Sequence, residues 1–174
     1  MFKKNKISKS REIILYNNIL SLSRNKLLFT KFDLSDTFQN RIYLIFLHVS
    51  FLFIKIKQTK EKGVYKFFFQ KMFDLIFDKI ELNMREIGYG DTVINKNMKH
   101  LVKNFYNILL NCENFDKYRH DSDKMIFLKY LEFNNLIKNT NNISLIKYFD
   151  KYKAFCFDLS PDSVLRGDLN FKYE

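Results

Sequence analysis

The stretch from Phe73 to Tyr106 reads FDLIFDKIELNMREIGYGDTVINKNMKHLVKNFY, and it decides the fold because one helical pattern ends within it and another begins at once. Apolar side chains recur at helical spacing up to Ile87, and Gly88 follows as a residue that can take the left-handed conformation of a helix C-cap. Asp91 can then cap the next helix, with Thr92 as the rival cap. The stretch therefore predicts two consecutive helices joined by a very short turn.

The composition favours a helical fold for the whole chain. Its 174 residues are 47% apolar and include only one Pro and four Gly. This length is usual for one domain, and the apolar content can fill a core. Because Pro and Gly are scarce, little turn chemistry is left for a many-stranded β fold. We expect residues 1–174 to form one all-α domain, a single compact bundle of about six helices with an irregular C-terminal tail.

The spacing of apolar residues places the helices along the chain. They are expected at about residues 10–24, 38–57, 64–87, 92–111, 124–139 and 144–155, with a loop over 25–37. Ser8 or Ser10 can cap the first helix. The polar cluster at 139–142 indicates a break, and Pro161 and Gly167 exclude a continuous helix from the tail.

The third expected helix carries more aromatic side chains than one helix face can bury. Its pattern includes Phe67, Phe68, Phe69, Phe73 and Phe77. Surplus apolar surface of this kind is typical of a surface that binds an apolar partner. We expect the aromatic faces of the second and third helices to form that surface, with Phe69 as part of it.

The most apolar run is IYLIFLHVSFLFI, residues 42–54, which has 13 residues where roughly 20 are needed to span a bilayer. It is expected to be a buried core helix. His48 lies in this run, and a buried imidazole can bind haem iron or sense protonation. No second His stands three or four residues away and no Cys pair is near, so a core histidine with satisfied hydrogen bonds is the favoured interpretation.

The sequence carries no local signature of catalysis or of metal binding. No Ser or Cys stands beside a His and an acid, and no compact set of carboxylates is found. Metal-capable groups between Cys112 and Asp123 fit no zinc or calcium spacing, which favours a solvated loop. Cys112 and Cys156 are expected to be buried thiols. We expect a protein that is not an enzyme and uses no metal, cofactor or small-molecule substrate.

The net charge of +11 is concentrated near the N-terminus, where residues 1–60 carry 12 Lys or Arg against 3 acids. Basic clusters lie at residues 3–11 and 55–66, and either can bind RNA or anionic lipid. A solvated lysine face is the favoured interpretation of each cluster alone. A basic helical module that binds RNA or the ribosome is therefore the alternative function.

One motif resembles a known family. The pattern Met84-Arg85-Glu86-Ile87-Gly88-Tyr89-Gly90-Asp91, followed by Lys96 and Met98-Lys99, resembles the ubiquinol–cytochrome c chaperone family, whose members usually read Leu-Arg-Glu-x-Gly-Val-Gly-Asp and then Lys-x-Met-Lys. Arg41 and Leu47-His48 match an Arg and a Leu-His that members commonly carry in the preceding helix. Tyr89 replaces the usual Val, and Asn95 stands where a Gly often precedes the Lys. The resemblance covers about residues 32–115.

The resemblance implies an assembly factor for the cytochrome bc1 complex (respiratory complex III) that holds newly made cytochrome b. Mitochondrial relatives are also associated with the ribosome and act with a partner subunit. Lys, Asn, Ile and Phe are abundant, as in proteins from AT-rich genomes, and no persuasive presequence is found. These features predict a bacterial protein, cytoplasmic and peripheral to the inner membrane; if the protein is eukaryotic, the mitochondrial matrix is expected. Arg85 and Glu86 either form ion pairs around the turn or offer a charged edge to a partner.

Overall fold

The computed structural model describes residues 10–118, 120, 123–135 and 139–173. Its helices, in chain order, are α1 (Arg11–Ser23), α2 (Lys26–Thr30), α3 (Phe38–Lys57), α4 (Lys62–Ile87), α5 (Asp91–Glu113), the 3-10 helix η1 (Phe115–Lys117), α6 (Met125–Leu128), α7 (Asn139–Asp158) and α8 (Pro161–Arg166). The described residues form no strand, only an isolated antiparallel bridge between Leu34 and Phe133. The all-α prediction is confirmed.

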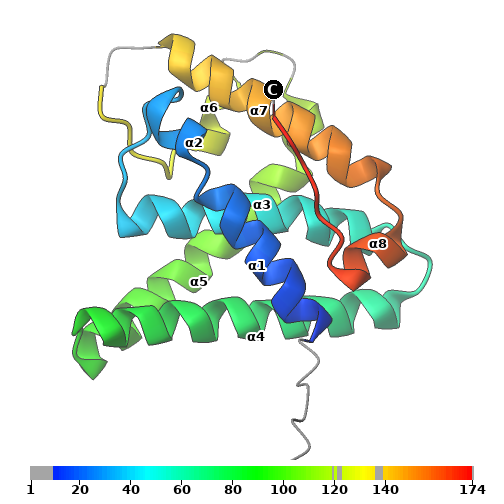
Figure 1. The fold of residues 1–174 in the computed structure, drawn as a ribbon, viewed down its shortest axis with the longest axis horizontal. Coiled ribbons are helices and arrows are strands. Elements are labelled where there is room, and N and C mark those ends of the chain that lie inside the picture. The colour runs from blue at the N-terminus through cyan, green and yellow to red at the C-terminus, as the bar shows by residue number, and fades with distance from the viewer. Residues whose placement is uncertain (1–9, 119, 121–122, 136–138, 174) are drawn as a thin grey trace, which may run out of the picture.

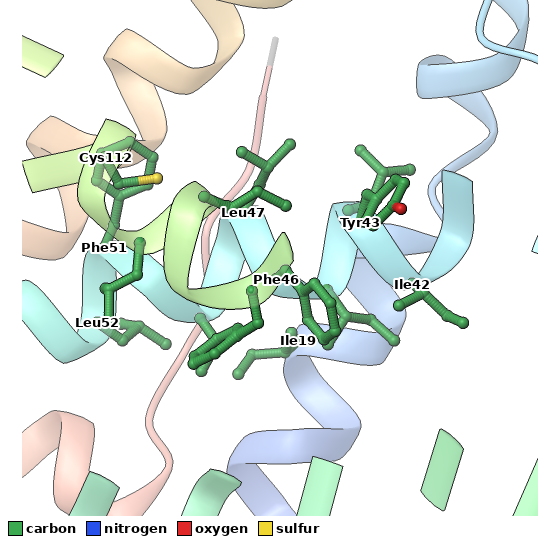
Figure 2. Packing of buried hydrophobic residues seen from close by; sticks show 14 of the residues in the cluster. Ile19, Ile42, Tyr43, Phe46, Leu47, Phe51, Leu52 and Cys112 are labelled. Carbon is green, nitrogen blue, oxygen red and sulfur yellow. The ribbon is translucent and has the colours of Figure 1, made fainter. Parts of the chain in front are cut away.

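Helix α3 is the centre of the bundle. Fourteen of its 20 residues are buried, and α1, α4, α5, α7 and α8 all pack against it. In Figure 1, α4 runs below α3, α7 lies above it and α1 crosses in front. Figure 2 shows Phe46, Leu47 and Phe51 of α3 among side chains that include Ile19 of α1 and Cys112 of α5. None of the helices that the structure describes is long and apolar enough to cross a membrane.

The first three long helices, α1, α3 and α4, begin and end close to the predicted residues, and local side chains cap the start of α1 and α3. The Ser10 side chain accepts a hydrogen bond from the N–H of Ile13, so Ser10 caps α1 as predicted, whereas Ser8 lies outside the described residues. Helix α3 has the predicted bounds, with the Thr37 hydroxyl accepting a hydrogen bond from the N–H of Asn40. The expected loop at 25–37 contains the short helix α2, which the Asn25 side chain caps.

The prediction of one helix over 124–139 is wrong, since among the described residues before α7 begins at Asn139 only Met125–Leu128 is α-helical. The residues that follow run extended beside the segment before α3. Asn40 donates hydrogen bonds from its amide to the carbonyl oxygens of Ser35 and Glu132, and its own oxygen accepts the N–H of Glu132. These tertiary bonds compete with helical ones for the same backbone groups, so the helix stops.

One further prediction near the C-terminus needs correction. The cluster at 139–142 does not break a helix, because α7 begins at Asn139 and continues to Asp158. Asn lowers the stability of a helix when it lies in the interior, but it costs little in the first turn, where these residues lie. The irregular tail is confirmed: Pro161 begins the short helix α8, Gly167 ends it in the left-handed conformation with φ of 86°, and residues 168–173 form no helix.

Candidate functional site

The turn between α4 and α5 carries the motif. Gly88 ends α4 with φ of 101°, and its N–H donates to the carbonyl of Arg85, so the predicted C-cap is confirmed. Gly90 is the N-cap of α5, and neither Asp91 nor Thr92 caps that helix by its side chain. That prediction was wrong because the turn is so tight that Asp91 already lies in the first helical position. Its carboxylate pairs with Arg85 instead, at 2.6 Å.

Arg85 and Glu86 have different surroundings. The Arg85 guanidinium bridges the carboxylates of Asp91, at 2.6 Å, and Glu81, at 2.8 Å, and these hydrogen bonds raise its pKa. Arg85 therefore fastens the end of α4 to the start of α5. Glu86 is exposed and makes no ion pair with the residues that the structure describes. The first interpretation, ion pairs around the turn, therefore fits Arg85. The second, a charged edge offered to a partner, fits only Glu86 of the two.

A groove of about 300 Å³ lies beside this turn, and we name it the Arg41–Glu86 groove. Its walls come from α1, α3 and α4; the lining residues are Tyr16, Leu20, Arg24, Phe38, Arg41, Ile42, Ile45, Ile80, Asn83, Glu86 and Ile87. The structure therefore brings together two motif residues that are 45 positions apart in the sequence. Arg24 was missed, because the sequence does not show that α1 packs on α4.

Arg41 is fixed at the edge of this groove. Its guanidinium makes two hydrogen bonds to the Asp36 carboxylate, at 2.7 and 2.9 Å, which raise the pKa of Arg41 and lower that of Asp36. The same guanidinium lies 5.8 Å from the ring centre of Phe29. An apolar floor with fixed charges at its edge is suited to an amphipathic segment of another polypeptide.

A second surface is a row of aromatic rings shared by α4 and α5, which we name the aromatic ladder: Tyr65, Phe69, Phe73 and Tyr106. The ring centres of Tyr65 and Phe69 are 5.9 Å apart, those of Phe69 and Phe73 are 5.9 Å apart and stacked, and those of Phe73 and Tyr106 are 6.0 Å apart. Phe69 and Phe73 are half-buried, whereas Tyr106 is 49% exposed. Leu110, one turn further along α5, is 55% exposed.

The aromatic face expected on the second helix is not available. Tyr43, Phe46, Phe51 and Phe53 of α3 are each at most 5% exposed, because the bundle packs around this helix. Of the two helices predicted to form the binding surface, α4 leaves a row of aromatic rings partly open, whereas α3 leaves Phe38 at its first position half-buried and its other rings buried. Tyr106 of α5 takes the place that α3 was expected to have, and its partnership with Phe73 is a tertiary contact.

His48 lies fully buried between α3 and α7. One ring nitrogen, Nδ1, is 2.6 Å from the carbonyl oxygen of Leu44, and the other, Nε2, is 2.8 Å from the hydroxyl of Tyr148. Tyr152 donates its hydroxyl to the backbone carbonyl of His48. Burial lowers the pKa of His48 to about 4, so the ring is neutral at physiological pH. With both nitrogens engaged, this geometry is that of a core histidine.

The remaining candidate residues are more dispersed. Lys96 and Lys99 are exposed on α5, away from α3. Cys112 is buried, and burial raises its pKa far above the usual range of a thiol. Among the residues that the structure describes, no group of three or more His, Cys, Asp or Glu could hold a metal ion, and Asp121 lies outside them. Both cysteines are free and buried.

The basic cluster at 55–66 is partly used within the fold. Lys55 donates to the carbonyl of Phe157 at 2.5 Å, and Lys57 pairs with Glu113 at 2.6 Å. These two lysines therefore contribute less free charge than the sequence indicates. The other basic cluster lies almost wholly in residues 1–9, outside the described residues.

A partly open aromatic ladder and a groove of mixed polarity are surfaces suited to another polypeptide. The model of the ubiquinol–cytochrome c chaperone family matches residues 30–124, which is more than half of the chain. The chain belongs to this family, and the predicted resemblance is confirmed.

One solved structure extends the comparison to nearly the whole fold. The crystal structure of the Cbp3 homolog from Brucella abortus matches with a TM-score of 0.76 and 21% identity, over 94% of this chain and 89% of that chain. At this identity the likeness concerns the fold alone. No curated protein matches the chain.

Proposed function

We propose that the chain is an assembly factor of the cytochrome bc1 complex, and that it binds newly made cytochrome b on the aromatic ladder. Membership of the ubiquinol–cytochrome c chaperone family supports the first part. The observation that carries the second part is the continuous row of partly open rings on α4 and α5. The ribosome and a partner subunit, which the resemblance implies, remain predictions.

The ladder suits an apolar helical client. Tyr65, Phe69 and Phe73 recur every four residues, so their rings follow one line for about 12 Å along α4. Tyr106 and Leu110 extend this line onto α5. Because each ring packs against the next, the rings are already ordered and lose little rotamer freedom when a client covers them. A segment of a membrane protein that has not yet entered its complex needs such a cover in water.

Basic residues adjoin the apolar line. Lys99 and Lys103 are exposed on α5 and precede Tyr106 by seven and three residues, which places them on the same side of the helix. A client helix whose apolar stretch ends in acidic residues complements this arrangement. In this proposal the motif residue Lys99 binds acidic residues of the client beside the ladder. The contact takes place at the cytoplasmic side of the membrane, where cytochrome b is inserted.

The RNA-binding alternative gains no support of its own. Lys55 and Lys57, which belong to one of its two basic clusters, make contacts within the fold. The RNA-binding alternative also assigns no function to the partly exposed rings of the ladder. Persistence of client binding at high salt is expected for the apolar ladder, whereas RNA binding falls steeply because released counterions drive it.

The test is to delete the gene in its host and to record the b-type haem spectrum of the membranes. We expect selective loss of cytochrome b with intact oxidases. A plasmid copy of the gene should restore the spectrum, and so should the Ile126→Glu variant, in which an apolar side chain of similar exposure, 43%, is replaced away from the ladder. Tyr106→Glu should accumulate normally and fail to restore it.

Two outcomes would contradict the proposal at different levels. Normal cytochrome b in the deletion strain would refute the assembly function itself. Full restoration by Tyr106→Glu, with loss in the deletion strain, would retain the function and exclude the ladder as the client site.

A further inference from the structure

A separate surface lies at the N-terminal end of α4, at the lower right of Figure 1, where α1 begins and α8 packs nearby. It contains a groove of about 370 Å³. The lining residues are Arg11, Glu12, Leu15, Gly63, Val64, Phe67, Phe68 and Leu165. We name this groove, together with the cations around it, the Phe67 corner. Neither the motif nor the aromatic ladder lies in it.

Phe67 is the most exposed large apolar side chain of the residues that the structure describes, at 63%. Its neighbours on α4 do not cover it: Lys66 is exposed, and Lys71, also exposed, lies with its ammonium 5.4 Å from the Phe67 ring centre. Exposed apolar surface of this kind commonly marks a site that binds another molecule or a membrane. The adjacent apolar groove makes the open surface continuous.

The charge around Phe67 is predominantly positive. Arg11, Lys60, Lys62, Lys66 and Lys71 stand against only two acids, Glu12 and Glu61, in the same segments. Among the described residues, none of the five cations has an ion-pair partner. Further along α4 the exposed face becomes acidic at Asp74 and Asp78, which confines the basic surface to one end of the helix.

The chain that leads into this corner has the same character. Residues 1–9 contain four lysines and no acid, and they join α1 at Ser10, next to Arg11 in the groove wall. The sequence that precedes α1 is therefore basic as well.

We propose that the Phe67 corner docks on an anionic lipid bilayer, with Phe67 entering the boundary between headgroups and acyl chains while Lys66 and Lys71 contact phosphates. An exposed aromatic ring flanked by lysines is the combination that binds such an interface, because it joins apolar burial to attraction by anionic headgroups. RNA would also satisfy the lysines and stack a base on Phe67, but the aliphatic groove walls of Leu15, Val64 and Leu165 suit acyl chains rather than bases. Docking here leaves the aromatic ladder open for a client.

The expected effects follow from the contribution of each group. One lysine near an anionic surface strengthens binding roughly fivefold. Reversing two of them in Lys66→Glu/Lys71→Glu should therefore weaken vesicle binding at least roughly 25-fold. Phe67→Ala keeps the charge and removes the inserted ring, which should weaken binding about tenfold.

A matched control is provided by α7. This helix lies on the far side of α3 from α4 in Figure 1, and it carries the exposed residues Lys147 and Lys151. The Lys147→Glu/Lys151→Glu variant has the same total charge as the double variant of α4. Because charges further than the Debye length of about 10 Å are screened, it should bind within about threefold of the unsubstituted chain.

The experiment is sedimentation of the full chain with vesicles of phosphatidylcholine and phosphatidylglycerol, and with vesicles of phosphatidylcholine alone, after circular dichroism has shown that each variant is folded. We expect binding to the anionic vesicles only, lost in the two α4 variants and kept in the α7 variant. No binding, equal binding to neutral vesicles, or equal losses in the α4 and α7 double variants would each overturn the proposal. Tight binding of single-stranded RNA that depends on Phe67, without binding to either kind of vesicle, would also overturn the proposal. The assay contains no client, so its result is independent of the proposed assembly function.

Discussion

Replacement of Asn40 by alanine should destabilise the fold by about 3 kcal/mol. Asn40 is fully buried at the start of α3, and its amide nitrogen donates to the carbonyl oxygens of Ser35 and Glu132, at 2.7 Å each. Its amide oxygen accepts the N–H of Glu132 at 2.9 Å. Three hydrogen bonds at about 1 kcal/mol each give the estimate. Water can reach the freed backbone groups of the exposed Glu132, so no larger penalty is added.

Urea unfolding followed by circular dichroism measures this loss, because the chain has no Trp for fluorescence. Asn107→Ala is the matched control, since Asn107 is exposed on α5. The melting temperature should fall by roughly 6–12 °C for Asn40→Ala and hardly at all for Asn107→Ala. Asn40→Asp should be worse at neutral pH, because a carboxylate cannot donate to two carbonyl oxygens. Stabilities of Asn40→Ala and the unsubstituted chain within about 0.5 kcal/mol would refute the reasoning.

Three further predictions concern single positions. Gly88→Ala should cost about 1 kcal/mol in urea unfolding, because φ is 101° there. Gly63→Ala, in the first turn of α4 with open space around it and no positive φ, should be neutral or slightly stabilising; equal losses would contradict the assigned turn. Gly167→Ala should lower the free energy of unfolding more than Gly88→Ala does, since φ is 86° and an added Cβ would lie 3.0 Å from the backbone nitrogen of Leu15. If the melting temperature fell less than for Gly88→Ala, α1 and α8 would be able to move apart to admit the Cβ. The neutral His48 has a pKa lowered from 6.5 to about 4, so stability should decline by about 3 kcal/mol as pH falls through that window, and a His48→Gln variant whose pH profile is the same would exclude His48 as the cause.

The sequence predicts features that depend on neighbouring residues. The C-cap at Gly88, the N-cap at Ser10 and the bounds of α3 follow from propensities and apolar spacing within a few residues. Local signals also misled where they were ambiguous: Asp91 can cap a helix, but the structure places it one position too late and pairs it with Arg85.

The sequence does not predict features that depend on tertiary packing. The segment after α6 is extended because Asn40 binds Glu132, a residue 92 positions away. The aromatic ladder forms because Tyr106 of α5 lies beside Phe73 of α4. Helical spacing within one segment predicts the row of rings on α4 but not this tertiary contact. In the same way, Arg41 and Glu86 stand out separately as motif residues, and only the packing of α1, α3 and α4 brings them to one groove.

The most direct test of the central proposal is photo-crosslinking from the aromatic ladder in growing cells. A photoreactive phenylalanine analogue is placed at Tyr106, and, as a control of similar exposure, at Ile126. We predict a crosslink from position 106 to newly made cytochrome b that disappears once the complex is assembled, and none from position 126. Crosslinks from both positions, or from neither while the strain still assembles cytochrome b, would contradict the account.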